Sequence, residues 1–459
     1  MAEKKFSKLE IFEQRNNVGG VWNYNKSAAT PSNLIVPNTA PTNLPDKSIY
    51  DDGQKQHVFI SPVYEYLETN IPKSLMNYSD LPFPKEAPVF PPHKLVKQYI
   101  EKYSTDLLDF ISLDKQVIDI RPDSNSYDSK WTVSARNLLT GKVTAQKFDA
   151  VIIANGHYND PFVPDIKGLA EWNSAFPGSI SHSKFFRNNS QFTNQKIIVV
   201  GNSASGVDLA SQICEVSQHP LFISEKKNSL FSTGKSPLVI EVPEIVEFSI
   251  KDKSIVFADG RIERDVDAIV FCTGYLYSYP FLQSLSEPVV SDGSRARSLY
   301  EHIFYIPLPT LAFVGTLQRI VPFPVSEGQG AIIARVWSGR LTLPSAEKMR
   351  EWEAKLIEER GDGKNFTMLH FPLDSSYINK LHAWSKLALP RAGLLNEGKG
   401  KIPPYWGEEK RWVRERFVMI KGASQRLGEK RHNVRTLEEL GFDYQKWKSN
   451  SNKDMKAQI

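Results

Sequence analysis

One segment constrains the fold of this chain more than any other. Residues 196–213, KIIVVGNSASGVDLASQI, have the pattern of a buried strand, a glycine-rich turn and an amphipathic helix. Gly201 allows the tight turn, Ser203 lets backbone amides approach a pyrophosphate, and Gly206 allows the helix to pack closely on the strand. The helix N-terminus would then present unpaired N–H groups to the phosphates. The pattern predicts a dinucleotide site, and a purely structural turn of small residues is the weaker alternative.

The next strand, HPLFISEKK, should carry the residue that meets the adenosine ribose. The hydroxyl of Ser224 and the charges of Lys226 and Lys227 favour NADPH. Glu225 weakens this interpretation, because an acidic residue at this point is typical of NAD sites. A lysine-rich strand end in solvent explains the same residues equally well, so both readings stay open.

Three further apolar runs predict buried strands, at residues 8–12, 150–154 and 268–272. Their alternation with helical patterns indicates an α/β fold with parallel sheets. The strand–turn–helix unit lies between two stretches that end in ANGH and CTGY. This order predicts two Rossmann-like domains, with one inserted into a larger one. The predicted boundaries are 1–163 and 277–459 for the larger domain and 164–276 for the inserted one, with a mostly helical C-terminal region that ends in a loose tail.

Glu13 lies at the end of the first apolar run. A carboxylate at the end of the second strand of a dinucleotide fold binds the ribose hydroxyls, about 20 residues after the glycine-rich loop. Counting back from Glu13 places that loop before Met1. We therefore expect the first strand and phosphate loop of the larger domain to be missing from residues 1–459. The alternative is that KLEIFE is an ordinary strand and that no part of the fold is missing.

Composition excludes several classes of protein. Hydrophobic residues make up 41% of the chain and the formal charge of +5 is spread out, which argues against a disordered chain and a nucleic-acid partner. Cys214 and Cys272 are too few and too far apart for a disulfide framework or a CxxC pair. The N-terminus lacks the apolar core of a signal peptide, and no apolar run could span a bilayer. We expect a cytoplasmic protein without a membrane anchor or a metal site.

Several segments, taken in order, resemble the flavin-containing monooxygenases, especially their fungal branch. They are IFEQRNNVGGVWNY, SPVYEYLETNIPKSLMNYSDLPFP, FPGSISHSKFF, GNSASGVDL, FCTGY and FVGTLQRIVPFPVSEGQG. The third segment fits the fingerprint F-x-G-x-x-x-H-x-x-x-[YF], although His182 alone would more often be a core histidine. The fingerprint usually ends in tryptophan in Baeyer–Villiger enzymes, and here it ends in Phe186. Disulfide reductases share the architecture but need a cysteine pair.

The resemblance implies that Glu13 holds the FAD ribose, that Thr69 and Asn70 lie beside the isoalloxazine ring and the nicotinamide, and that Gln329 faces the ring. Cys272 stands where the family has alanine in its F-A-T-G-Y signature. The resemblance and the glycine pattern together give these cofactor-binding residues: Glu13, Gly19, Gly20, Val21, Trp22, Thr69, Asn70, Gly201, Ser203, Ser205, Gly206, Asp208, Ser224, Lys226, Thr273, Gly274 and Gln329.

The resemblance also implies a reaction of the N,N-dimethylaniline monooxygenase type. NADPH would reduce FAD, and the flavin hydroperoxide formed with O2 would oxygenate a soft nitrogen or sulfur atom of a small molecule. Asn70 would be the catalytic residue, hydrogen-bonding near the intermediate. Two alternatives remain: a Baeyer–Villiger or N-hydroxylating relative, and a non-catalytic remnant that binds at most NADP. The choice of sulfur or nitrogen and the oligomeric state, with a homodimer as one option, stay open.

Overall fold

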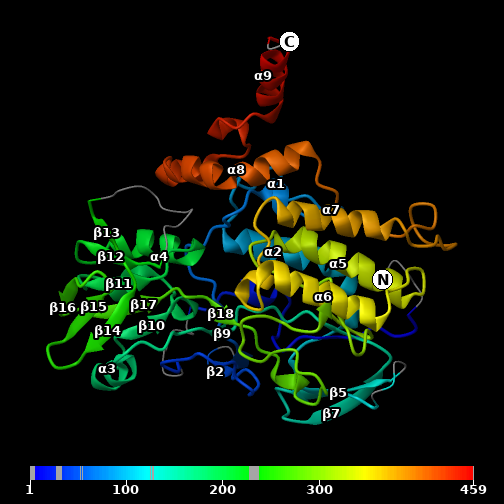
Figure 1. The fold of residues 1–459 in the computed structure, drawn as a ribbon, viewed down its shortest axis with the longest axis horizontal. Helices are drawn as coiled ribbons and strands as arrows, with labels where there is room; N and C mark the ends of the chain where they lie inside the picture. Colours follow the sequence, from blue (N-terminus) through cyan, green and yellow to red (C-terminus); the bar gives the residue numbers. More distant parts are fainter. Residues whose placement is uncertain are drawn as a thin grey trace.

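Two α/β units lie side by side in the chain (Figure 1). The computed structural model describes residues 6–26, 34–51, 53, 55–124, 126, 129–226 and 237–457. The smaller unit contains residues from β10 to β17 and is drawn mainly in green. The larger unit combines the first 160 residues with the helical second half of the chain, so its two parts are far apart in sequence and adjacent in space.

The smaller unit is built on a five-stranded sheet in which every pair of neighbouring strands is parallel. Side chains alternate between its two faces, as strand geometry requires. Ile197 and Val199 pack in a cluster with helix α4 (Ala204–Cys214), whereas Ile198 packs with helix α3 (Leu169–Ala175) on the other face. The strand order is β10 (Ile180–His182), β17 (Ala268–Phe271), β11 (Ile197–Val200), β12 (Leu221–Ser224), β13 (Val239–Val242).

Helix α4 approaches strand β11 so closely that only glycine fits at the contact. A Cβ atom at Gly206 would lie 1.8 Å from the carbonyl oxygen of Gly201. Gly201 itself has a φ of 107°, which side-chain-bearing residues rarely adopt. The predicted strand, tight turn and helix are therefore confirmed, with the helix starting at Ala204.

The chain enters and leaves the smaller unit through two adjacent strands. Strand β9 (Asp160–Pro161) pairs antiparallel with β18 (Tyr275–Leu276). Between them lies the five-stranded sheet and a small antiparallel sheet of β14 (Ile245–Ser249), β15 (Ser254–Phe257) and β16 (Ile262–Arg264). The smaller unit is thus inserted into the larger one, as the sequence predicts.

The larger unit contains several short sheets. Strand β1 (Ile11–Phe12) pairs parallel with β4 (Ile111–Ser112), and β8 (Val151–Ile153) pairs parallel with β21 (Leu311–Phe313). The remaining strands are β2 (Ile49–Asp51), β3 (Gln56–Val58), β5 (Lys115–Pro122), β6 (Trp131–Asn137), β7 (Val143–Phe148), β19 (Leu299–Tyr300) and β20 (Phe304–Tyr305).

The prediction that residues 150–154 form a buried strand is only partly right. The strand exists, but Ile152 at its centre is 45% exposed. Among the residues that the structure describes, β8 is the edge of its sheet and has β21 as its one neighbour. Ile153 is buried and Ile152 is exposed because neighbouring side chains point to opposite faces of the strand, so only one face of β8 is covered.

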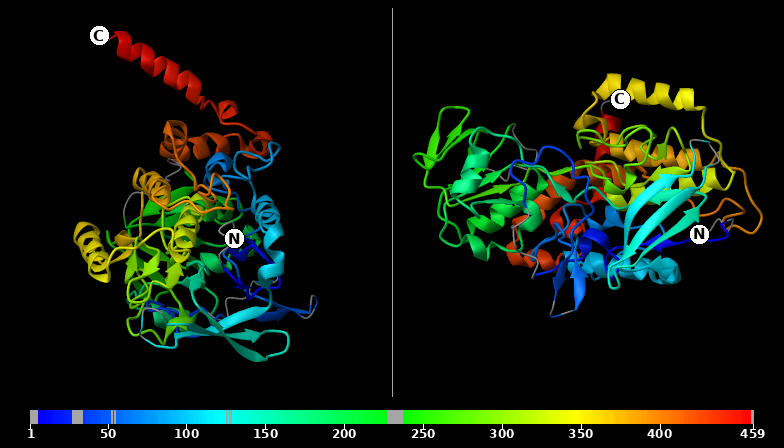
Figure 2. Two further views of the ribbon diagram at one scale, coloured as in Figure 1. Left: turned by 90° about the vertical axis from the view of Figure 1, so that its right-hand side faces the viewer. Right: turned by 90° about the horizontal axis from the view of Figure 1, so that it is seen from below.

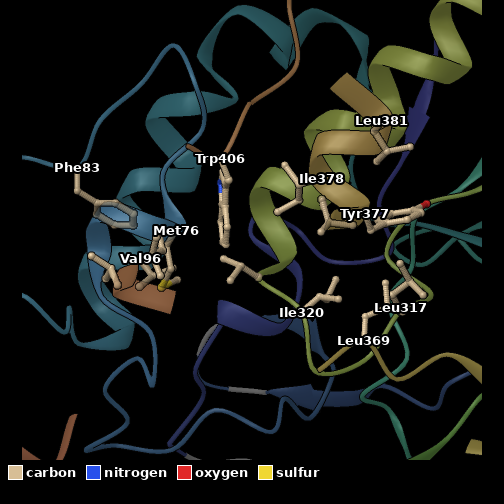
Figure 3. Close-up of a cluster of buried hydrophobic side chains, with 14 of the residues drawn as sticks. Met76, Phe83, Val96, Leu317, Ile320, Leu369, Tyr377, Ile378, Leu381 and Trp406 are labelled. Carbon is tan, nitrogen blue, oxygen red and sulfur yellow. The ribbon is translucent and has the colours of Figure 1, made fainter. Parts of the chain in front are cut away.

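Helices from both parts of the sequence share one hydrophobic core (Figure 3). Met76, Phe83 and Val96 lie on one side of Trp406, and Tyr377 and Ile378 lie on the other. The core therefore fixes the N-terminal helices against the C-terminal ones. The helices of this unit are α1 (Lys73–Met76), α2 (His93–Tyr103), α5 (Pro322–Trp337), α6 (Ala346–Arg360), α7 (Leu373–Ser385), α8 (Glu408–Gln425) and α9 (Tyr444–Ala457).

The C-terminal segment that the sequence predicts to be loose is helical as far as Ala457. Helix α9 runs to Ala457 and projects from the body of the molecule (Figure 2). Its first turns are held by aromatic contacts, because the rings of Trp447 and Trp412 have centroids 5.6 Å apart. Within the described ranges, no helix has both the length and the apolar character needed to cross a membrane.

The close contact at Gly206 makes a stability prediction. The substitution Gly206→Ala should lower the free energy of unfolding by about 1–3 kcal/mol, because overpacking against backbone cannot be relieved by a side-chain rotation. Gly330→Ala in α5 is the matched control, since a Cβ there meets nothing within 4 Å. The control should be neutral or stabilising by at most about 1 kcal/mol. Thermal unfolding measures both, and equal melting temperatures for the two variants would contradict the packing argument.

Candidate functional site

The glycine turn of the smaller unit places several predicted residues around the N-terminus of α4. Ser203 is the N-cap residue, and Ser205 is exposed in the first helical turn. The Gly201 amide donates to the carbonyl of Ser224 at 2.8 Å, which fixes the start of the turn. The free N–H groups of the first turn and the helix dipole make this end of α4 suitable for an anion.

An arginine that the sequence analysis missed lies at the same place. Arg319 Nη2 donates to Ser203 Oγ at 2.8 Å, from a loop 116 residues further along the chain. Arg319 has a φ of 60°, an uncommon conformation for a residue with a side chain. Its carbonyl accepts a hydrogen bond of 3.0 Å from Arg414, which in turn pairs with the fully buried Asp374 at 2.6 Å. A buried ion pair thus holds the Arg319 backbone while its guanidinium reaches α4.

The residues predicted to meet the ribose differ in their exposure. Ser224 is almost fully buried, and its hydroxyl donates to the carbonyl of Pro243 at 3.0 Å. Lys226 is exposed and pairs with Glu244 at 3.0 Å. Lys227 lies outside the described residues. The hydroxyl of Ser224 is therefore already used inside the protein, whereas the Lys226 ammonium is accessible to a phosphate.

Asp208 joins α4 to a segment of the larger unit. Its carboxylate accepts hydrogen bonds from the hydroxyl of Tyr64 and, at 3.1 Å, from Gln212. Burial is the main cause that raises the pKa of Asp208, and the hydrogen bond from Tyr64 opposes it. The Tyr64 hydroxyl and the Asp208 carboxylate thus connect the two dinucleotide units.

Glu13 follows strand β1 directly, and its side chain bonds to the backbone two residues further along. Its Oε1 accepts a hydrogen bond of 2.8 Å from the amide of Arg15, and burial raises the pKa of its carboxyl group. Arg15 Nε then donates to the carbonyl of Gly20 at 3.1 Å, while Arg15 Nη1 is buried without a partner among the described residues. Arg15 therefore connects Glu13 to the glycine turn that the sequence placed along the same cofactor.

That glycine turn contacts the segment that carries Asn70. Gly19 and Gly20 both have positive φ, and Trp22 packs against the main core. The carbonyl of Val21 accepts a hydrogen bond from Ser61, whose own carbonyl accepts one of 2.8 Å from the buried Arg187. The structure thus brings the predicted residues 13–22 into contact with Ser61, at the start of the segment that leads to Asn70.

Thr69 and Asn70 have contrasting environments. Thr69 is buried, its amide donates to Pro91 O at 3.0 Å and its hydroxyl donates to Ile71 O at 3.0 Å. Asn70 is half-buried, and its side-chain amide has no hydrogen-bond partner in the part of the chain that the structure describes. Hydrogen bonds therefore fix Thr69, whereas the side-chain amide of Asn70 is available to a ligand.

Gln329 and the CTGY segment are held by internal bonds. Gln329 is fully buried; its side chain accepts from the Gly315 amide at 2.9 Å and donates to Tyr377 at 3.2 Å. The Thr273 hydroxyl donates to the carbonyl of Phe162, and the Gly274 carbonyl accepts from the buried His182 at 3.0 Å. Burial lowers the pKa of His182 to about 3, so its ring is a neutral structural group.

The family model described as Flavin-binding monooxygenase-like matches residues 51–236 and 237–388. The chain belongs to this family. The flavin-containing monooxygenase FMO GS-OX-like 9 of Arabidopsis thaliana is 33% identical over 428 residues, which are 88% of each chain. The thiol-specific monooxygenase of Saccharomyces cerevisiae is 32% identical over 354 residues, covering 73% of this chain and 72% of that protein.

Solved structures of flavin monooxygenases have the same fold. The S-allyl-L-cysteine S-oxygenase of Allium sativum superimposes with a TM-score of 0.70 at 28% identity, covering 92% of this chain and 89% of that one. Tmm from Pelagibacter gives a TM-score of 0.69 at 21% identity, covering 92% and 85%, which supports the fold alone. The prediction of two Rossmann-like dinucleotide-binding units is confirmed.

FAD and NADPH are the cofactors of this monooxygenase family. The β11–α4 turn fits NADPH, because the first-turn N–H groups of α4 are available to a phosphate and Arg319 adds a positive charge at the same helix end. Glu13, the glycine turn and the unpartnered Nη1 of Arg15 fit the FAD side. Residues that would cradle the FAD pyrophosphate are not identified among those described.

The position of Arg319 makes a binding prediction for this flavin monooxygenase. Arg319→Met should weaken NADP+ binding about tenfold, because the loss of one charge-assisted hydrogen bond costs about 1.5 kcal/mol. Isothermal titration of the purified chain with NADP+ measures this change. Arg261→Met, in the exposed turn before β16, is the matched control and should bind like the wild type. Equal dissociation constants for the two variants would show that Arg319 does not contact the nucleotide.

Proposed function

We propose that this chain is an NADPH-dependent flavin monooxygenase that uses O2 to oxygenate a soft nucleophilic atom of a small molecule. The observation that carries the proposal is the direct bond between the two units. Tyr64 donates to Asp208 on the nucleotide helix, and Asn70 with its free amide follows six residues after Tyr64. This contact places the segment that leads to Asn70 against the helix that would hold the nucleotide, which supports a flavin and a nucleotide bound next to each other.

The chain's own residues would bind, orient and shield the reactants. Bound FAD supplies the redox chemistry that the side chains lack, since proteins leave such steps to cofactors. Asn70 would donate a hydrogen bond from its side-chain amide at the reacting group, and Thr69 would keep the position of Asn70 fixed. Glu13 and the Gly19–Trp22 turn would hold the FAD, while Gly201, Ser203, Ser205 and Lys226 would hold NADPH.

Sulfur is the favoured target within this proposal. Two relatives, the thiol-specific monooxygenase and the S-allyl-L-cysteine S-oxygenase, carry sulfur substrates in their names. Nitrogen oxygenation of the N,N-dimethylaniline type is the second candidate. The domain boundaries 1–163, 164–276 and 277–459, a homodimer and a cytoplasmic location stay predictions.

The visible absorption spectrum of the purified chain after incubation with FAD tests the proposal. Bound flavin that bleaches when NADPH is added without oxygen, and recovers its colour in air, is the expected result. Product analysis with a thiol, a thioether and a tertiary amine then separates sulfur from nitrogen chemistry. A chain that binds NADP+ and never takes up FAD would support the non-catalytic alternative.

The role of Asn70 makes a prediction about coupling. Asn70→Ala should raise the hydrogen peroxide released per NADPH oxidised at least several-fold, because the hydrogen bond that favours oxygen transfer to the substrate is lost. Peroxide and product are quantified against NADPH consumption in the same reaction. Asn77→Ala is the control, since the Asn77 amide bonds only to the adjacent carbonyl of Tyr78. If Asn70→Ala keeps wild-type coupling, Asn70 has no part in the oxygenation step.

A further inference from the structure

Glu68, next to the Thr69–Asn70 pair, contacts three basic side chains from the C-terminal region. Glu68 accepts from Arg431 Nε at 3.0 Å and from Lys421 Nζ at 3.2 Å, and His432 Nδ1 lies 3.4 Å away. Lys421 is on α8, and the other two are in the 3-10 helix Gly428–Asn433. More than 350 residues separate Glu68 from these partners, so their contact is purely tertiary.

Two members of this cluster are well shielded from water. The side chains of Glu68 and Lys421 are 11% and 13% exposed. Lys421 Nζ also lies 4.5 Å from the ring centre of Phe90, and burial lowers the pKa of its ammonium group. Salt screens the attraction between shielded charges less than it screens surface pairs. Leaving one of these charges without its partner is costly, so the pair restricts the positions of both side chains.

The same lysine reaches the backbone next to Asn70. Lys421 Nζ donates to the carbonyl oxygen of Thr69 at 3.0 Å. This carbonyl belongs to the peptide bond that joins Thr69 to Asn70. The bond therefore restrains the peptide plane from which the Asn70 side chain starts.

Backbone hydrogen bonds hold the same segment between two others. The Thr69 amide donates to Pro91 O at 3.0 Å, and the His93 amide donates to Leu67 O at 2.9 Å. The Val89 amide donates to Val434 O at 3.0 Å, directly after the Gly428–Asn433 helix. Residues 67–69 thus lie against residues 89–93, which are bonded to the C-terminal region.

We propose that Glu68 is a positioning residue that, through Lys421 and Arg431, makes the C-terminal region set the orientation of Asn70. The inference rests on the proposed function of Asn70 in oxygen transfer. Glu68 acts by fixing the Lys421 ammonium, which fixes the Thr69 carbonyl. Removing one partner of a shielded ion pair also lowers stability, so the test has to separate a local change at residues 67–71 from a general loss of stability.

Hydrogen–deuterium exchange of the chain without cofactors tests the proposal independently of activity. In Glu68→Gln, the amides of residues 67–71 should exchange at least tenfold faster than in the wild type. Glu408→Gln is the matched control, because Glu408 is on α8 like Lys421 and its exposed ion pair is with Lys448 on α9. Exchange of residues 67–71 that stays at the wild-type rate in Glu68→Gln would overturn the proposal.

A second readout uses the loaded enzyme. Glu68→Gln should release several-fold more peroxide per NADPH with an unchanged KM for NADPH, since α4 and Arg319 are untouched. Coupling that stays at the wild-type level in a variant with faster exchange would overturn the positioning role. If the wild type oxidises no NADPH, the proposed function fails, while the exchange experiment still decides whether the cluster fixes residues 67–71.

A third variant covers the case that Glu68→Gln does not fold. Arg431→Gln removes one partner whose side chain is 26% exposed and leaves the Lys421 pair in place. It should show a smaller increase in exchange, confined to the same residues. An increase spread evenly over the larger unit would mean that the cluster only stabilises the fold and would overturn the proposal.

Discussion

The hydrogen bond from Tyr64 to Asp208 joins helix α4 of the smaller unit directly to the larger unit. Burial raises the pKa of Tyr64 well above its ordinary value, so the phenol keeps its proton and remains a donor throughout the physiological range. On one side the bond ends at α4, whose start is fixed by the close packing of Gly206 on Gly201. On the other it ends at a segment that Arg187 holds through the carbonyls of Ser61 and Val63. The bond therefore joins the helix predicted to hold the nucleotide to the segment that leads to Asn70.

Charged residues from the second half of the chain complete both sides of this contact. Arg319 reaches the N-terminus of α4, and Lys421 reaches the carbonyl of Thr69. A shielded carboxylate stabilises each of these contacts. Asp374 pairs with Arg414, which donates to the Arg319 carbonyl. Glu68 pairs with Lys421. The hydrophobic core around Trp406 fixes the helices that carry these charges (Figure 3). The helical C-terminal region therefore contacts both segments that the sequence assigns to the site.

Local patterns could be predicted from the sequence, and long-range contacts could not. The β11–α4 unit follows from an apolar run, two glycines and a helical period, all within 18 residues. Glu13 could be placed at a strand end for the same reason. Arg319 and Glu68 give no local signal, because a single charged residue in a loop is usually solvated. Ile152 reads as a core residue, and only the sheet order shows that its strand lies at an edge.

The predicted site residues fall into two groups, those whose side chains have hydrogen-bond partners inside the protein and those whose side chains do not. Asp208, Ser224 and Gln329 have partners inside the protein, so they shape the site from within. Asn70 and one nitrogen of Arg15 have none among the described residues. Leaving a buried donor unpaired costs free energy that a bound ligand can recover. Arg15 Nη1 therefore contributes binding energy only when an acceptor is present, as the predicted role of the neighbouring Glu13 in FAD binding would require.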